Sequence, residues 1–423
     1  MVWQQVIPES TGRQSGYLTM SGKTVDRQLA RGAITPQTAL APGEFPEVET
    51  RRVDAAASTF FRRAAFEDKS DLGVCFSGGG TRSASATLGQ LRGLRAIKLQ
   101  DGSTLMDRVK YISAVSGGSW GATPYVFLPE SFTDDEFLGP YKPPEYLARS
   151  DFQATNVPLF VNTIADSKIT WRFFGSLLLK WKGDEAYADA LGKIFLKPYG
   201  LDGGKFFTQD EVSRTRILQQ SPSLRGDDFY CARPGRPLLI VGGTISQKKR
   251  HEVFSPYRNI HLEMTPLYVG SPVLFHYAGP DYLPVGGGYI EPFAYDSRAP
   301  KSREAGLYTV RLQREWHHLT NPRFTLADMM AVSGAAPSHY PIAGFFGFPE
   351  FEHWSPAYPT NFHSVEYLHA DGGVLENTGI MPLLARRVSN IVVFVNSEKP
   401  FTPDYPEREG VLSDSVTALF GRS

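Results

Sequence analysis

The chain has 423 residues, a length that suits one large domain with insertions better than several simple domains. Hydrophobic residues make up 41% of it, enough for a sizeable core and too many for a disordered chain. Lys plus Arg and Asp plus Glu each number 44, so a formal net charge of zero gives no case for nucleic acid as a partner.

Residues 1–70 are polar and basic, and we expect them to form an extension packed on the domain that follows. The N-terminus lacks the basic start and continuous apolar run of a signal peptide. No stretch approaches the roughly 18 apolar residues that a transmembrane helix requires. Cys75 and Cys231 are too few for a disulfide framework in a chain of this length. Together these features predict a soluble, cytoplasmic protein.

From Leu72 the pattern changes to two strand–turn–helix units. LGVCFS predicts a short buried strand and is followed by three glycines, then by apolar residues at helical spacing: Ala84, Leu88, Leu91 and Leu94. VKYISAV predicts a second strand, which ends at Ser116 and is again followed by glycines and a helix. Pro124 is expected to kink that helix or end it early. The pair of units predicts a parallel α/β sheet.

The middle of the chain, residues 130–235, is less regular and reads as a cap or insertion in a domain that spans 71–423. Within it, the aromatic run at 169–181 is either part of the core or a lid that touches lipid. Strand character returns in RPLLIVGGTIS, IHLEMTPLYVG, GLYTVRL and SNIVVFVNS. The basic run at 247–251 is a solvated loop or a contact for anionic headgroups.

Three short motifs carry candidate chemistry. In AVSGGSW, Ser116 lies between a strand and a glycine-flanked helix start, which matches a nucleophile elbow. A serine that only caps a helix would give the same sequence pattern. In SGGGTR, bare backbone N–H groups suit an oxyanion hole, and a glycine-rich turn is the other interpretation. A phosphate-binding Walker loop is disfavoured because no Lys follows the glycines.

The third motif is HADGGVLENTG, which contains Asp371. An Asp followed by two glycines is also typical of a hairpin turn. The order of glycine turn, elbow serine and distant D-G-G nevertheless favours one active site built from all three motifs.

Five segments resemble the catalytic domains of the cytosolic phospholipase A and lysophospholipase families, which are related in fold to patatin. CFSGGGTRSASATLGQLRGL resembles their glycine loop, KYISAVSGGSWGA their elbow and ADGGVLENTG their aspartate motif. IHLEMTPLYVGSP and MAVSGAAPSHYP resemble two further segments. The resemblance implies a three-layer α/β sandwich with a mostly parallel central sheet, in which 71–423 is the catalytic domain.

The resemblance also implies a role for each matching residue. Ser116 would be acylated by the lipid ester, and Asp371 would act directly as its base. Gly78, Gly79 and Gly80 would supply the oxyanion N–H groups. Arg82 would face the phosphate of the substrate. A free Asp is a poor base at neutral pH, because its pKa is about 3.9, so a dyad requires burial that raises this pKa.

The expected function is hydrolysis of a phospholipid or lysophospholipid through an acyl-enzyme, during transient peripheral contact with a membrane surface. An acyltransferase with the same dyad and a catalytically silent lipid-binding module are the alternatives. A Ser–His–Asp triad that uses His339 or His369 is an alternative to the dyad. No cofactor is expected, and no metal either, since His363, His369 and Asp371 lack the spacing of a standard metal site.

Overall fold

The computed structural model describes the following residues: 47–53, 69–148, 150, 185–246, 259–275, 285–304, 307–312, 324–335, 349–357 and 364–396. The aromatic run at 169–181, the basic run at 247–251, His339, His363 and residues 1–46 lie outside them.

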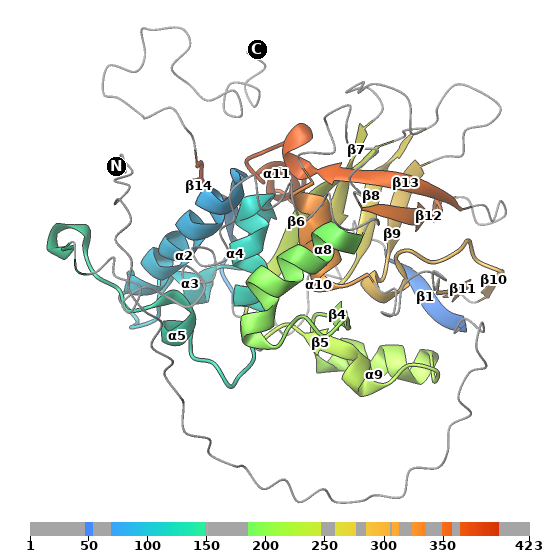
Figure 1. Cartoon of the computed structure of the whole chain (residues 1–423), viewed down its shortest axis with the longest axis horizontal. Helices are drawn as coiled ribbons and strands as arrows, with labels where there is room; N and C mark the ends of the chain where they lie inside the picture. Colours follow the sequence, from blue (N-terminus) through green and yellow to red (C-terminus); the bar gives the residue numbers. More distant parts are fainter. Residues whose placement is uncertain are drawn as a thin grey trace, which may run out of the picture.

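A twelve-stranded sheet forms the centre of the described structure (Figure 1). Its order is β10-β11-β1-β9-β8-β7-β6-β3-β2-β14. Outside this order, β13 pairs with both β6 and β12. In chain order the strands are β1 (Glu47–Val53), β2 (Leu72–Phe76), β3 (Tyr111–Val115), β6 (Leu238–Ser246), β7 (Asn259–Met264), β8 (Val269–Phe275), β9 (Val285–Ile290), β10 (Ser302–Glu304), β11 (Leu307–Arg311), β12 (Glu350–His353), β13 (Val365–Asp371) and β14 (Asn390–Phe394).

The sheet confirms the α/β class but corrects one expectation about it. Only β14, β2, β3 and β6 are parallel neighbours, and the other pairings in the described sheet are antiparallel, so the sheet is not mostly parallel. The reason lies in the connections, because a parallel pair needs a long crossover and an antiparallel pair needs only a turn. β7 and β8 are joined by Thr265–Tyr268, a turn closed by the Thr265 hydroxyl.

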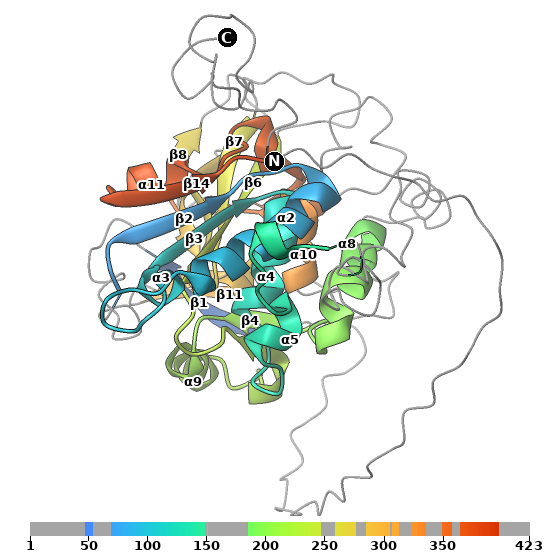
Figure 2. The same cartoon turned by 90° about the vertical axis from the view of Figure 1, so that its left-hand side faces the viewer.

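Helices cover both faces of the sheet and give the expected three layers (Figure 2). On one face lie α2 (Gly80–Ala96), α4 (Gly117–Val126) and α10 (Leu326–Ser333); α11 (Met381–Ala385) packs on the other, where Leu383 lies against Gly73 of β2. The four apolar positions predicted to face the core from α2 are all buried. Pro124 lies within α4, which ends soon after it, at Val126.

Residues 130–235 contribute a small second sheet and several helices. These elements are α5 (Asp134–Leu138), α8 (Glu185–Leu191), β4 (Phe206–Thr208), α9 (Glu211–Gln220) and β5 (Phe229–Cys231). Of the helices, α5 packs on α2 and α8 packs on α10. β1, which comes from the first 70 residues, lies inside the main sheet between β11 and β9. The division into an extension, a catalytic domain and a cap stays a prediction.

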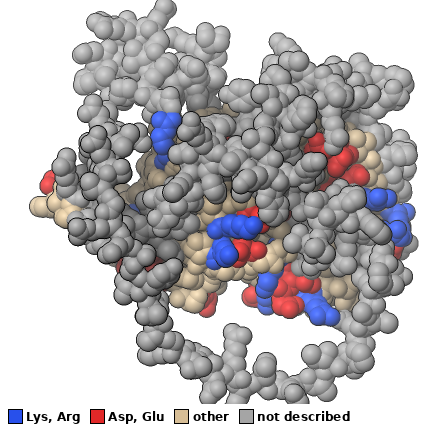
Figure 3. Space-filling view, in the orientation of Figure 1, with Lys and Arg blue, Asp and Glu red and all other residues tan. Residues whose placement is uncertain are grey.

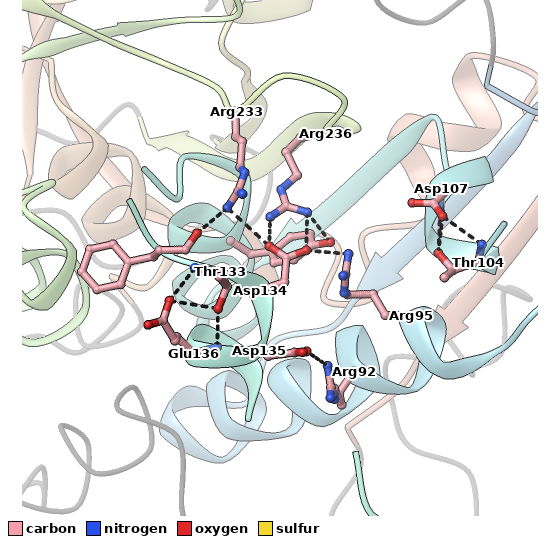
Figure 4. A network of polar contacts seen from close by, with 12 residues as sticks. Arg92, Arg95, Thr104, Asp107, Thr133, Asp134, Asp135, Glu136, Arg233 and Arg236 are labelled. Atoms are coloured by element: carbon pink, nitrogen blue, oxygen red, sulfur yellow. Dashed lines mark hydrogen bonds and ion pairs between the residues drawn. The ribbon is translucent and has the colours of Figure 1, made fainter. Parts of the chain in front are cut away.

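Asp134 joins this region to the core through an arginine cluster (Figure 4). Its carboxylate accepts hydrogen bonds from both terminal nitrogens of Arg236 and pairs with Arg95 of α2 at 2.5 Å and with Arg233 at 3.5 Å. The Arg236 guanidinium also lies 3.9 Å from the centre of the Tyr125 ring, at the end of α4. One carboxylate therefore ties α5 to α2, to α4 and to the segment before β6.

Charges are mixed on the described surface (Figure 3). On the face shown, described Lys and Arg side chains lie beside Asp and Glu side chains. In the described structure, Asp189 on α8 pairs with Lys193, two residues after the end of that helix, at 2.5 Å, and Arg214 pairs with Glu211 on α9. The described part of this face therefore has no broad basic patch of the kind that attracts nucleic acid.

Candidate active site

Two strands meet end to end along one edge of β6 and bring together residues 255 positions apart in the sequence. β3 pairs in parallel with β6 as far as Val115, opposite Gly242. β13 pairs antiparallel with the following residues of β6, and its last residue, Asp371, lies opposite Gly243. Because β3 and β13 run towards each other, the sheet register places Asp371 beside Ser116, the residue that follows β3.

Ser116 has a backbone conformation that is rare for a residue with a side chain, with φ 51° and ψ −128°. The chain turns here from β3 directly into α4, as at a nucleophile elbow. The Ser116 N–H donates to Ser333 Oγ at 2.8 Å, and Ser333 Oγ donates to the carbonyl of Gly242 at 2.6 Å. This buried bridge from α10 to β6 holds the turn, and nothing in the residue pattern marked Ser333 for it.

Ser116 and Asp371 are in direct contact. Ser116 Oγ lies 2.8 Å from Asp371 Oδ2, and both residues are only 6% exposed. The other carboxylate oxygen accepts from the N–H of Gly373 at 2.7 Å. Burial raises the pKa of Asp371 to about 6 against the opposing effect of these two hydrogen bonds. A dyad base requires a shift in this direction, and at pH 7 most of the carboxylate still carries its charge.

The glycine loop packs directly on the elbow. A Cβ on Gly117 would lie 1.9 Å from the carbonyl oxygen of Gly80, so only glycine allows this approach. The loop itself turns through φ 140° at Gly79 and 63° at Gly80, both in the region that favours glycine. Gly117 is the first residue of α4, and its N–H has no partner within that helix. Gly117 was not among the predicted oxyanion donors, although the residue after an elbow nucleophile commonly has that role.

The three predicted oxyanion glycines differ in their hydrogen bonds. The N–H of Gly78 donates to the carbonyl of Asn377 at 3.0 Å and is therefore not available to bind an oxyanion. Among the described residues, none accepts from the N–H of Gly79 or Gly80. The available donors around Ser116 are thus Gly79, Gly80 and Gly117, and Gly78 shapes the loop.

Arg82 is exposed in the first turn of α2, close in sequence to these donors. Arg82 lies at the same end of the sheet as Ser116, because α2 begins at the glycine loop that packs on the elbow. Contact between Arg82 and a substrate phosphate stays a prediction.

His369 is buried on β13 and bonded away from Ser116. Its Nδ1 lies 2.8 Å from the carbonyl of Tyr367, which can only accept, so Nδ1 carries the proton. Nε2 lies 2.7 Å from the hydroxyl of Tyr295. Burial lowers the pKa of His369 to about 3, which keeps the ring neutral. The described contacts therefore connect Ser116 to Asp371 without a histidine between them.

Two other kinds of site, a metal centre and a membrane-spanning helix, are absent from the described residues. Within them, no group of three His, Cys, Asp or Glu side chains is placed to hold a metal ion. None of the helices described is long and apolar enough to cross a membrane.

Neither a protein family nor a curated protein matches the sequence. Several solved structures are similar in part, and two of them are of one human protein. Human GIVD cytosolic phospholipase A2 has 13% identity and a TM-score of 0.37, with 81% of this chain and 50% of that chain covered. The same human protein in complex with methyl gamma-linolenyl fluorophosphonate and terbium chloride has 16% identity and a TM-score of 0.27, with 71% and 34% covered. This chain therefore spans half or less of those chains, and function is inferred from the geometry of the Ser116–Asp371 pair.

Proposed function

We propose that the protein is a lipid acyl hydrolase of the phospholipase A or lysophospholipase type that uses a Ser116–Asp371 dyad. The observation that carries the proposal is the 2.8 Å contact between Ser116 Oγ and Asp371 Oδ2 in a buried site. A strained serine, a carboxylate with a raised pKa and unpartnered backbone donors occur together at functional sites more often than in purely structural ones.

The chemistry follows from these positions. Asp371 takes the proton from Ser116 Oγ as the oxygen attacks the ester carbonyl carbon. The carbonyl oxygen becomes negative, and the N–H groups of Gly79, Gly80 and Gly117 stabilise it. The C–O bond to the alcohol breaks, the alcohol leaves with the proton held by Asp371, and the acyl group stays on Ser116. Water then attacks this acyl-enzyme with Asp371 again as base, which releases a fatty acid and restores Ser116.

A phospholipid is the proposed substrate for two reasons. The motifs around Ser116, Asp371 and the glycine loop resemble those of phospholipases. Arg82 also adds an exposed guanidinium at the start of α2, where the helix dipole favours an anion as well. The substrate would be met by transient docking at a membrane surface. A silent lipid-binding module would have no need of a strained serine bonded to a buried carboxylate.

Labelling with a fluorophosphonate and hydrolysis of phospholipid vesicles test the proposal together. Ser116→Ala should abolish both, since loss of a nucleophile that works with a partner costs several powers of ten. Ser113→Ala is a matched control, because this serine lies on the same strand and its buried hydroxyl makes no hydrogen bond to a described residue. Retention of more than a few per cent of activity in Ser116→Ala would rule out Ser116 as the nucleophile. Product analysis with and without an added alcohol separates hydrolysis from acyl transfer.

A further inference from the structure

Ser77, the residue just before the glycine loop, is held at three points. Its N–H donates to the carbonyl of Phe394 at 3.1 Å, at the end of β14. Its hydroxyl accepts from the backbone N–H of Asn396 at 2.7 Å. Its carbonyl accepts from Ser83 Oγ at 2.5 Å. Since Ser77 and Ser83 are buried, the start of the loop is fixed both to β14 and to α2.

The Asn396 side chain completes this arrangement. Its Nδ2 donates to Ser83 Oγ at 2.8 Å and lies 3.5 Å from the carbonyl of Ser77. Its Oδ1 accepts from Gln90 Nε2 at 2.9 Å. Because the amide nitrogen of Gln90 can only donate, it turns the oxygen of Asn396 towards itself and the nitrogen towards Ser83. The hydroxyl of Ser83 is thereby left to donate to Ser77.

Glycines give the loop no stiffness of their own, so its shape depends on what holds its ends. Gly79 and Gly80, near Ser116, have N–H groups with no acceptor among the described residues. On one side of them lies Ser77, held as described, and on the other lies Ser83 in the first turns of α2. An oxyanion hole works because its donors are already in place before charge develops.

We propose that Asn396 is a positioning residue that holds the glycine loop in its oxyanion-binding shape and so sets the rate at which Ser116 is acylated. This inference rests on the proposed function of Ser116. Asn396 itself touches no reacting atom, and acts through Ser83 and Ser77.

Asn396→Ala removes the side-chain bonds and keeps the backbone N–H that binds Ser77, so the strand pairing survives. We expect it to lower the rate constant for fluorophosphonate labelling about tenfold to a hundredfold, less than the loss of an oxyanion donor outright. The kcat for an ester should fall by a similar factor, with KM unchanged within about twofold. Ser83→Ala should act alike. The double variant should be no slower than the slower single variant, because both changes break the same chain of hydrogen bonds.

Asn390→Ala is the matched control. This asparagine lies at the other end of β14 and is exposed, and the one hydrogen bond that its side chain makes to a described residue is a 3.4 Å contact with the carbonyl of Asp71. Its labelling rate should equal that of the wild type. Gln90→Ala is a milder test that leaves every group of the loop in place, and we expect a loss of several-fold.

Amide hydrogen exchange of residues 77–84, measured in a Ser116→Ala background, gives a readout that needs no activity. Exchange should rise in Asn396→Ala and stay unchanged in Asn390→Ala. If exchange rises in Asn396→Ala but fluorophosphonate labelling does not depend on Ser116, the proposed function is wrong. The inference that Asn396 supports the glycine loop would then still hold. Wild-type labelling rates in both Asn396→Ala and Gln90→Ala, or fully additive losses in the double variant, would overturn the inference.

Discussion

Two aspartates, Asp371 buried and Asp134 partly buried, lie in different regions of the molecule and have opposite surroundings. Asp371, where β3 and β13 meet, has a serine hydroxyl and a backbone N–H as partners, and burial raises its pKa to about 6. Burial also acts on Asp134, but Arg236, Arg95 and Arg233 outweigh it and hold the pKa of Asp134 below its ordinary value. Both carboxylates are satisfied by hydrogen bonds. Asp371 has no cation among its described partners and can take a proton near neutral pH, whereas Asp134 cannot. This difference separates a reactive site from a structural one.

The largest expected effect comes from Asp371→Asn, which keeps the shape of the side chain but cannot accept a proton. We expect kcat to fall by at least about 10³-fold, as for the loss of a partner in other serine hydrolases. The fold should persist, and the free energy of unfolding at pH 7 should rise by about 1–3 kcal/mol, because a raised pKa marks a charge that is costly to bury. Steady-state kinetics and urea unfolding measure the two effects. Loss of both activity and stability would place Asp371 with the structural aspartates.

Asp134→Asn should give the reverse result. Without its charge, three guanidiniums lie together at the ends of α2 and α4, and we expect a loss of about 2–4 kcal/mol. This is less than the 3–5 kcal/mol for a fully buried pair, because Arg95 and Arg233 are partly exposed. The kcat of the folded fraction should be unchanged. Since the pKa of Asp134 is lowered on folding, its contribution is present above about pH 4 and is lost as the pH falls below that. Unfolding curves at pH 7 and pH 3 test both statements.

Arg82→Ala separates a third role, recognition of the substrate, from both of these. If Arg82 binds phosphate, kcat/KM for a phospholipid should fall by the equivalent of about 1.5–3 kcal/mol in transition-state binding energy, the range for a charged hydrogen bond. Hydrolysis of a small uncharged ester should hardly change. Arg82→Lys should recover only part of the loss, since a point charge lacks the planar fork of arginine. An equal loss on both substrates would mean that Arg82 supports the loop.

The comparison also shows which features could be predicted from sequence. Ser116, Asp371 and the loop glycines stand in short motifs, where the local backbone itself requires those residue types. Ser333 and Asn396 gain their roles only through folding, since they bond to residues 217 and 313 positions away. The direction of β7 to β9 was not predicted either, because a short strand that is covered on both faces reads as an apolar run whichever way its neighbours run. Gly78 is a glycine in the predicted loop, as an oxyanion donor would be, and only the structure shows that its N–H is bonded to Asn377.

The central claim is that Asp371 acts on Ser116 directly, and the pH dependence of kcat/KM tests it most directly. In the wild type, activity should fall as the pH drops through about 6, where Asp371 becomes protonated and can no longer accept the proton of Ser116. A histidine base would give a limb in the same range, so the profile is to be compared among Asp371→Asn, His339→Ala and His369→Gln. The account predicts that the limb is lost in Asp371→Asn, whose residual activity is flat across this range, and kept in both histidine variants. A limb that persists in Asp371→Asn and disappears with His339 or His369 would contradict it.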